Sequence, residues 1–197
     1  MGKISMGLTM SLDGFIAGVD DDVSELFTWY SLGDTDVPLP GPNLVFKVSS
    51  ASADLLNKEW SKLGALVTGR RDFDVSNAWG GKALLGVPTF IVTHNPPSEW
   101  NYPDSPFTFV TDGVESAIKQ AQAIVGDKTI GIGGSTIIQQ CLKLGLLDEI
   151  NIHLVPIILG KGIRLFDNLD TQSIQLENTQ VLEGTGVTHL IYRVIKS

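Results

Sequence analysis

Cysteine is almost absent from this chain, because Cys141 is the only one among 197 residues. A lone cysteine cannot build a disulfide framework or a cysteine zinc cluster within the chain, and its scarcity favours a reducing cytoplasm. Histidine occurs three times. His153 and His189 fall inside predicted strands, where a packed or surface role is more common than catalysis. We therefore expect no metal site and leave these two histidines out of the candidate site.

Positive charge is also scarce. The chain has 14 Lys and Arg residues against 22 Asp and Glu residues, a formal net charge of −8, and no run of cations. A nucleic-acid surface needs clustered cations, so we expect the partners to be small molecules or protein. No apolar stretch approaches the length needed to span a membrane, and we expect no membrane contact. The length, with 43% hydrophobic residues, suits one domain over residues 1–197.

The clearest pattern covers residues 129–166, which read as strand, glycine turn, helix and strand. Gly133-Gly134 interrupts the first strand, Ser135 or Thr136 can cap the helix, and Gly145 stands where the helix should end. The unpaired N–H groups at a helix start carry partial positive charge, and glycine lets a phosphate approach them. The turn is therefore a candidate diphosphate seat, and the alternative is a tight turn without a ligand.

Polar or glycine-rich turns follow three further predicted strands, which lie within residues 65–68, 88–93 and 107–111. A parallel arrangement would bring all four turns to one edge of a sheet. Backbone donors and cations at that edge would suit a nucleotide with several phosphates, and a pair of arginines favours NADP over NAD, although a solvated pair is the alternative. The four turns are Gly69-Arg70-Arg71, Thr93-His94, Thr111-Asp112 and Gly133-Gly134-Ser135-Thr136.

The remaining elements complete an α/β pattern. Ser50 or Ser52 can cap one helix, and Asp112 with Glu115 forms a capping box for another, which we expect to be buried through positions that include Ile124. Alternating strands over residues 174–182 and 187–195 predict a C-terminal antiparallel hairpin. The expected fold is a mixed, mostly parallel sheet flanked by helices.

Residues 19–48 are too long for a passive connection in a compact domain. They include an apolar cluster that looks exposed, made by Leu26, Phe27, Trp29 and Tyr30. We interpret the segment as a long substrate-side loop or lid, and the alternative is a loop packed on a neighbouring subunit.

Familiar nucleotide motifs do not fit. The stretch from Gly131 to Thr136 lacks the last glycine of a Rossmann fingerprint and has no acidic residue about twenty positions further on, and the GKS or GKT of a P-loop is missing. Nor is there a nucleophile elbow.

Five motifs in order do resemble a known family. They are the stretch from Met10 to Ala17, Thr68-Gly69-Arg70-Arg71, Gly133-Gly134-Ser135, Leu147-Asp148-Glu149-Ile150, and the stretch from Pro156 to Phe166. They are similar to the reductase domain of bacterial riboflavin biosynthesis, a member of the dihydrofolate reductase-like fold, from about residue 3 to about residue 195. The resemblance implies a three-layer α/β fold, usually in a homodimer, that binds NADPH and reduces a pterin-like or ribosylamino-pyrimidine substrate.

The resemblance also implies roles for individual residues. The turn Gly69-Arg70-Arg71-Asp72 would hold the 2′-phosphate and diphosphate, and Thr93-His94 would border the adenosine. The turn from Gly133 to Thr136 would seat the diphosphate, and Ile16 and Ala17 would flank the nicotinamide. The zinc deaminase signature of the bifunctional riboflavin enzyme, H-x-E with P-C-x-x-C, is missing, so we expect a stand-alone reductase.

The proton donor is harder to assign from the sequence. Asp13, at a strand end beside the implied nicotinamide pocket, is the first catalytic candidate, and the alternative is that it caps the Asp-Gly turn. Folate reductases place an acid on the first helix, where this chain offers Asp54 and Glu59. The main hypothesis is an NADPH-dependent reductase of a small heterocycle. The alternatives are a non-catalytic dimeric nucleotide-binding protein and a scaffold whose glycine turns are purely structural.

Overall fold

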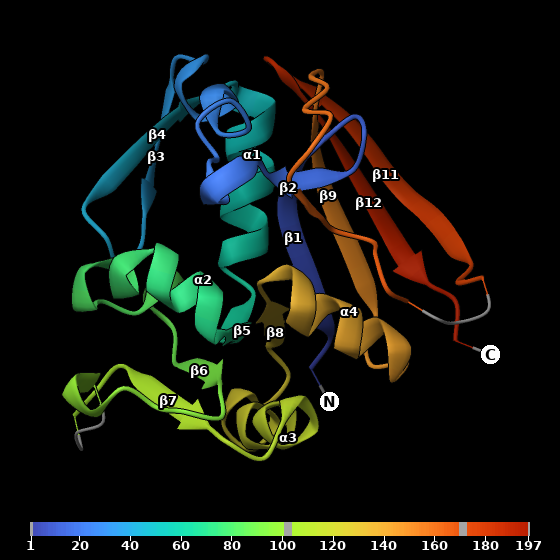
Figure 1. Cartoon of the computed structure of the whole chain (residues 1–197). Coiled ribbons are helices and arrows are strands. Elements are labelled where there is room, and N and C mark those ends of the chain that lie inside the picture. Colours follow the sequence, from blue (N-terminus) through green and yellow to red (C-terminus); the bar gives the residue numbers. More distant parts are fainter. Residues whose placement is uncertain (1, 101–103, 170–172, 197) are drawn as a thin grey trace.

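A twisted sheet forms the centre of the computed structural model, which describes residues 2–100, 104–169 and 173–196 (Figure 1). Its order is β11-β12-β9-β1-β8-β5-β6-β7. The strands from β9 to β7 pair in parallel, and β12 and β11 add an antiparallel edge. Their bounds are β1 (Ile4–Ser11), β5 (Leu63–Gly69), β6 (Thr89–Val92), β7 (Phe107–Val110), β8 (Thr129–Ile132), β9 (Glu149–Val155), β11 (Leu176–Gly184) and β12 (Val187–Val194).

Helices cover both faces of the sheet. The helices α3 (Val114–Val125) and α4 (Ser135–Lys143) pack on one face and enclose the largest apolar cluster, which includes Met6, Val67 and Ile130. The opposite face carries α1 (Ser50–Trp60), α2 (Arg70–Val75) and the hairpin of β3 (Thr35–Leu39) and β4 (Leu44–Val48) (Figure 1). Two smaller apolar clusters lie under α1 and α2. The predicted mixed, mostly parallel sheet flanked by helices is confirmed.

Residues 19–48 are more structured than expected. Two short 3-10 helices, Val19–Asp21 and Thr28–Ser31, precede the β3–β4 hairpin. Leu26 and Trp29 are fully buried, so the prediction of an exposed apolar cluster was wrong for them, whereas Phe27 is 44% exposed. The reason is that α1 and the hairpin enclose these side chains in their own apolar cluster.

Helix starts also differ from the predictions. Ser49 caps α1, because its Oγ accepts a hydrogen bond from the Ser52 N–H at 3.4 Å. The capping box of Asp112 and Glu115 does not form, because Gly113 turns the chain with a φ of 100° and α3 begins only at Val114. Gly134, not Ser135 or Thr136, is the N-cap of α4.

Two further expectations fail in detail. Ile124 is 56% exposed although we expected it to be buried in α3. The second strand of the central crossover, which its apolar pattern predicts over residues 149–158, ends at Val155, three residues earlier. The short strand β10 (Ile163–Arg164), which follows that crossover, pairs with β2 (Phe15–Ala17).

Candidate functional site

A cavity of about 830 Å³ lies on the sheet face that carries α1 and α2. The two helices cover different strands, and the strands between them contribute Gly7 of β1 and Gly131 of β8 to the lining. Gly7 is exposed although its strand lies in the middle of the sheet. Because glycine has no side chain, Gly7 leaves room for a ligand against the sheet, whereas the space beside Gly131 is filled by Leu63 and Leu66.

The cavity continues to the carboxyl edge of the parallel strands, where the predicted cofactor residues meet. All twelve line it, and they come from four separate segments of the chain. The convergence follows from the parallel pairing of β5, β6 and β8, whose carboxyl ends share one edge. These residues are Ile16, Ala17, Gly69, Arg70, Arg71, Asp72, Thr93, His94, Gly133, Gly134, Ser135 and Thr136.

The Gly133-Gly134 turn has the backbone properties of an anion seat. Gly134 adopts a φ of +73° and is the N-cap of α4. A Cβ atom on Gly133 would lie 3.0 Å from Thr68 Oγ1, tighter than ordinary contacts allow. The positive φ favours glycine at Gly134, and a side chain at Gly133 would require Thr68 to shift. The turn and the start of α4 line the cavity, where the first N–H groups of a helix have no partner within the helix. A diphosphate fits this donor set.

Asp72 lies next to that seat and is not simply a helix cap. Its Oδ2 accepts a 2.7 Å hydrogen bond from Thr68 Oγ1. Burial raises the pKa of the Asp72 carboxyl, while the bond from Thr68 acts in the opposite direction.

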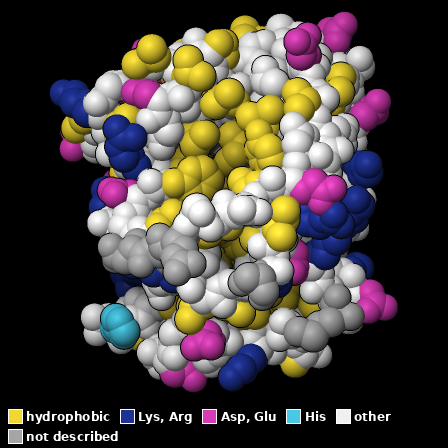
Figure 2. Space-filling view, turned by 90° about the vertical axis from the view of Figure 1, so that its right-hand side faces the viewer, with side chains coloured by type: hydrophobic (Ala, Val, Ile, Leu, Met, Phe, Trp, Pro, Cys, Tyr) yellow, Lys and Arg dark blue, Asp and Glu magenta, His cyan; other side chains and the backbone are white. Residues whose placement is uncertain are grey.

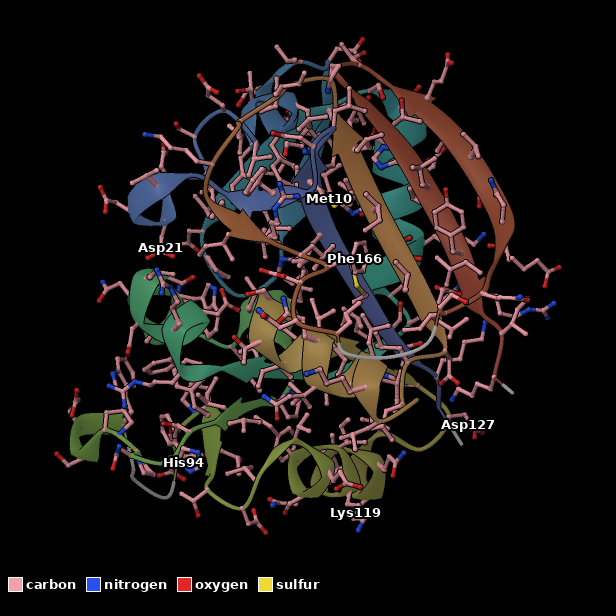
Figure 3. All side chains as sticks on the ribbon, turned by 45° about the vertical axis from the view of Figure 1, so that its right-hand side comes forward. Met10, Asp21, His94, Lys119, Asp127 and Phe166 are labelled. Atoms are coloured by element: carbon pink, nitrogen blue, oxygen red, sulfur yellow. The ribbon has the colours of Figure 1, made fainter. Side chains whose placement is uncertain are left out.

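The two predicted arginines are engaged with carboxylates of the protein. Arg70 Nε donates to both oxygens of Asp74, at 2.7 and 2.8 Å, and its Nη1 donates to the Asn95 carbonyl at 2.6 Å. Arg71 donates to both oxygens of Asp21, at 2.8 and 3.0 Å, and this bonding raises the pKa of Arg71. Asp21 reaches over α2 from the short helix after β2 (Figure 3).

Beneath α1 the cavity forms a second compartment with a different character. Tyr30, Phe46 and Trp60 contribute aromatic rings, and Glu59 contributes a carboxyl group. Burial, helped by the charge of Glu149, raises the pKa of Glu59 to about 7. Asn151 Nδ2 donates a 3.0 Å hydrogen bond to Glu59 Oε1. We call this region, lined by these residues together with Thr9 and His153, the α1 compartment.

The structure distinguishes the acids that the sequence left open. Asp54 is exposed on α1, while Glu59 lines the cavity. Asp13 does not line the cavity within the described part of the chain. Its carboxylate oxygens accept hydrogen bonds from Ser11 Oγ, Leu159 N and Gly160 N. These bonds, that from Ser11 above all, lower the pKa of Asp13 to about 2. The geometry favours the turn-capping alternative for Asp13.

Two polar residues of β9 were missed by the sequence analysis. Asn151 and His153 alternate with apolar residues along the strand, so both point into the α1 compartment. Both are buried, and the Asn151 side-chain oxygen has no hydrogen-bond partner within the described residues. The signal was the polar alternation of Glu149, Asn151 and His153 in a strand whose other residues are apolar.

The fold and this cavity define an α/β protein of the dihydrofolate reductase-like class. The chain belongs to the RibD C-terminal domain family, which matches residues 2–190. It is 22% identical over 206 residues to the uncharacterized protein YyaP of Bacillus subtilis (strain 168), covering 96% of this chain and 94% of that protein.

Two solved structures show the fold in other organisms. A putative riboflavin biosynthesis protein from Shewanella sp. PV-4 has a TM-score of 0.75, with 24% identity and full coverage of both chains. The dihydrofolate reductase of Enterococcus faecalis, solved with NADP(H), has a TM-score of 0.59 and 14% identity, covering 99% of this chain and 98% of the other. The predicted fold class and family are confirmed.

Proposed function

We propose that this protein is an NADPH-dependent reductase that transfers a hydride to a small heterocycle, either a ribosylamino-pyrimidine or a pterin-like compound. One observation carries the proposal. A single cavity joins the glycine turns at the strand ends to a compartment that holds an acid, Glu59, whose pKa burial raises to about 7. The names of the related structures, a riboflavin biosynthesis protein and a dihydrofolate reductase with NADP(H), support the same class of reaction.

In this proposal the strand-end turns hold the cofactor. Gly133, Gly134 and the start of α4 bind the diphosphate, and Arg70 and Arg71 exchange their carboxylate partners for the 2′-phosphate. Ile16 and Ala17 border the nicotinamide, between the two compartments. When bound, NADPH supplies the hydride.

The α1 compartment orients the acceptor and handles the proton. Tyr30, Phe46 and Trp60 offer flat apolar surfaces for a heterocycle and exclude water. Because its pKa lies near neutrality, the Glu59 carboxyl can hold a proton at its oxygen and pass it to a ring nitrogen of the acceptor. Asn151 fixes the orientation of that carboxyl through its 3.0 Å bond.

Thermal melting with NADPH, with NADH and with neither tests the cofactor assignment. A ligand at about a hundred times its dissociation constant should add about 2.7 kcal/mol of stability. We expect a larger shift with NADPH, and we expect Arg70→Ala combined with Arg71→Ala to abolish the difference. Equal shifts with both cofactors in the wild type would remove the 2′-phosphate role. Oxidation of NADPH with a panel of pterins and pyrimidines tests turnover.

A non-catalytic dimeric nucleotide-binding protein is the second candidate, because Asp13, the first candidate proton donor, caps a turn and does not line the cavity. It predicts NADPH binding without oxidation by any acceptor of the panel.

Among the described residues no helix is both long and apolar enough to cross a membrane. The single buried thiol, Cys141, is compatible with the proposed cytoplasmic location.

We also propose that the protein is a homodimer. The face of β1, β9 and β12 that points away from α1 carries half-buried apolar side chains, among them Met10, Leu154, Leu190 and Tyr192. Figure 2 shows apolar side chains gathered on the side of the molecule where β9, β11 and β12 lie. Exposed apolar surface of this kind is typical of a subunit interface.

A further inference from the structure

A chain of four side chains runs from the α1 compartment toward the start of α1. His153 Nδ1 lies 2.8 Å from His189 Nδ1, and His189 Nε2 lies 2.8 Å from Ser52 Oγ. Ser52 Oγ in turn lies 3.0 Å from Ser49 Oγ, at the helix cap. Only the first member, His153, lines the cavity.

The two imidazole rings are held in place by packing. His189 is fully buried, and His153 is 5% exposed. The Trp29 ring lies 5.5 Å from the His153 ring and 5.4 Å from the His189 ring, between centroids. Trp29 is itself fixed by the 3.2 Å bond that its Nε1 donates to Thr9 Oγ1. Neither ring can turn without disturbing this cluster.

This geometry links the tautomers of the two histidines. Two Nδ1 atoms 2.8 Å apart can share one hydrogen, so one ring carries hydrogen on Nδ1 while the other carries it on Nε2. Burial, with the neighbouring His189, lowers the pKa of His153 to about 3, and burial lowers the pKa of His189 to about 4. Both rings are therefore neutral at pH 7, and protonation does not break the linkage.

The chain has two complete arrangements. In one, Ser52 donates to His189 Nε2, His189 Nδ1 donates to His153 Nδ1, and His153 Nε2 carries a hydrogen. In the other, every bond is reversed and His153 Nε2 is an acceptor. Because His189 occupies Nδ1, Nε2 is the polar atom of His153 that remains for a ligand, and it has no partner within the described residues.

We propose that His153 Nε2 is a ligand-contacting atom of the α1 compartment, and that Ser52 and His189, which do not touch the ligand, set whether this atom donates or accepts. The proposal rests on the proposed function for the assignment of this compartment to the substrate. It makes His153 a recognition residue and makes His189 and Ser52 positioning residues.

The ligand class follows from the neighbours of His153. The unpartnered oxygen of Asn151 lies on the same face of β9, two residues earlier, so this wall holds a second polar atom whose bonding the chain does not satisfy. Both groups are uncharged, and Glu59 beside them is an acid. Such a wall suits an uncharged heterocycle with a carbonyl or amino substituent, and it repels a phosphate.

The tautomers are measured directly by long-range ¹H–¹⁵N correlation spectra of the protein labelled at histidine. We expect both rings to be neutral at pH 7 with opposite tautomers. Ser52→Ala should shift the tautomer balance of both rings together, whereas Ser50→Ala, at an exposed serine of the same helix, should leave it unchanged. Equal tautomers in the two rings, or a response confined to His189, would overturn the linkage. This measurement needs neither cofactor nor turnover.

The recognition role is measured with two probes that differ at one substituent, 2-amino-4-hydroxypyrimidine and 2,4-diaminopyrimidine. We expect calorimetry to show that Ser52→Ala changes the ratio of their dissociation constants by about threefold to tenfold, the range of one hydrogen bond. Ser50→Ala should leave the ratio unchanged, and His153→Phe should weaken the tighter probe. An unchanged ratio in Ser52→Ala overturns the role of the chain. If wild-type protein with a normal NADPH melting shift binds neither probe, the ligand assignment falls and the cofactor assignment stands.

Discussion

Arg71 and Asp21 lie fifty positions apart in the chain and join two parts of the cavity rim. The guanidinium donates to both carboxylate oxygens, at 2.8 and 3.0 Å. Asp21 belongs to the segment after β2, and Arg71 lies in the first turn of α2 at the strand-end edge. A carboxylate thus occupies the place on Arg71 that a phosphate of the cofactor would take.

Removing the Asp21 carboxylate, which competes for Arg71, should strengthen the binding of NADPH. Because an exposed ion pair is weak, Asp21→Asn is expected to strengthen NADPH binding by about 1.4-fold to fivefold, with NADH binding unchanged. Isothermal titration with both nucleotides measures the effect. Asp20→Asn, which removes the same charge at the neighbouring position, is the control. Equal gains for NADPH and NADH would show that Arg71 does not contact the 2′-phosphate.

Gly134→Ala should weaken the binding of NADPH and NADH alike, because we propose that the Gly133-Gly134 turn binds the diphosphate that they share. Its backbone has a φ of +73°, and a Cβ atom there would lie 3.3 Å from Thr68 Oγ1. We expect a stability loss of about 1 kcal/mol and loss of the melting shifts with NADPH and NADH. Gly145→Ala, at the other end of α4, has a φ of +64° and open space around the new Cβ atom. It should cost similar stability and keep the nucleotide shifts; the loss of those shifts in Gly145→Ala would mean that backbone strain alone explains the effect.

The position of the acid predicts how stability depends on pH. The pKa of Glu59 is raised from 4.5 in the unfolded chain to about 7 in the folded protein, so folding favours its protonated form. Its contribution is present below about pH 4.5 and is lost as the pH rises through 7. Glu59→Gln should therefore match the wild type at pH 4.5 and exceed its stability at pH 8 by about 1 to 3 kcal/mol.

Urea unfolding at the two pH values measures this difference. Asp54→Asn is the matched control, because Asp54 is an exposed acid on the same helix. We expect it to leave the pH dependence unchanged. If Glu59→Gln behaves in the same way, Glu59 is not held in a buried, proton-binding environment and its proposed catalytic role falls.

The apolar face of β1, β9 and β12 is the proposed dimer interface, so a charged residue introduced there should separate the two subunits. Val181 is 54% exposed on β11 and pairs with Leu190 of β12. Val181→Arg should convert a dimer into a monomer in sedimentation experiments, because a guanidinium in an apolar interface is costly. Val45→Arg, at a 58% exposed valine of β4 on another part of the surface, should keep the dimer. A monomeric wild type would refute the proposed homodimer.

Local sequence patterns were enough to predict the convergence of the strand ends. Alternating strands and helices imply parallel pairing, and parallel pairing alone brings Gly69, Thr93 and Gly133 to one edge. The inward direction of the Glu59 side chain could also be predicted from the sequence, because Ser52, Leu56 and Glu59 follow the helical spacing of one buried face. Glu59 nevertheless stayed one of two alternatives with Asp54, because an acid on such a face contradicts the apolar pattern.

Other features depend on tertiary contacts that no local pattern contains. His153 and His189, 36 residues apart in the chain, are paired by the register of β9 and β12, and Ser52 reaches His189 from α1. The capping box failed because Gly113 takes a conformation that places Asp112 outside the helix. The apolar residues of the long segment became core only once α1 and the β3–β4 hairpin enclosed them.

That enclosure predicts different stability effects at two aromatic residues two positions apart. Trp29 is 1% exposed, stacks on Tyr30 at 4.0 Å between ring centroids, and donates to Thr9. Trp29→Ala should cost about 3 to 5 kcal/mol, since it opens a cavity and removes a buried hydrogen bond. Phe27→Ala should cost much less because its side chain is substantially exposed. Urea unfolding of both variants measures the contrast. Similarly small losses in the two variants would mean that residues 19–48 are a loosely attached loop, in which case Trp29 could not hold His153 and His189 in place.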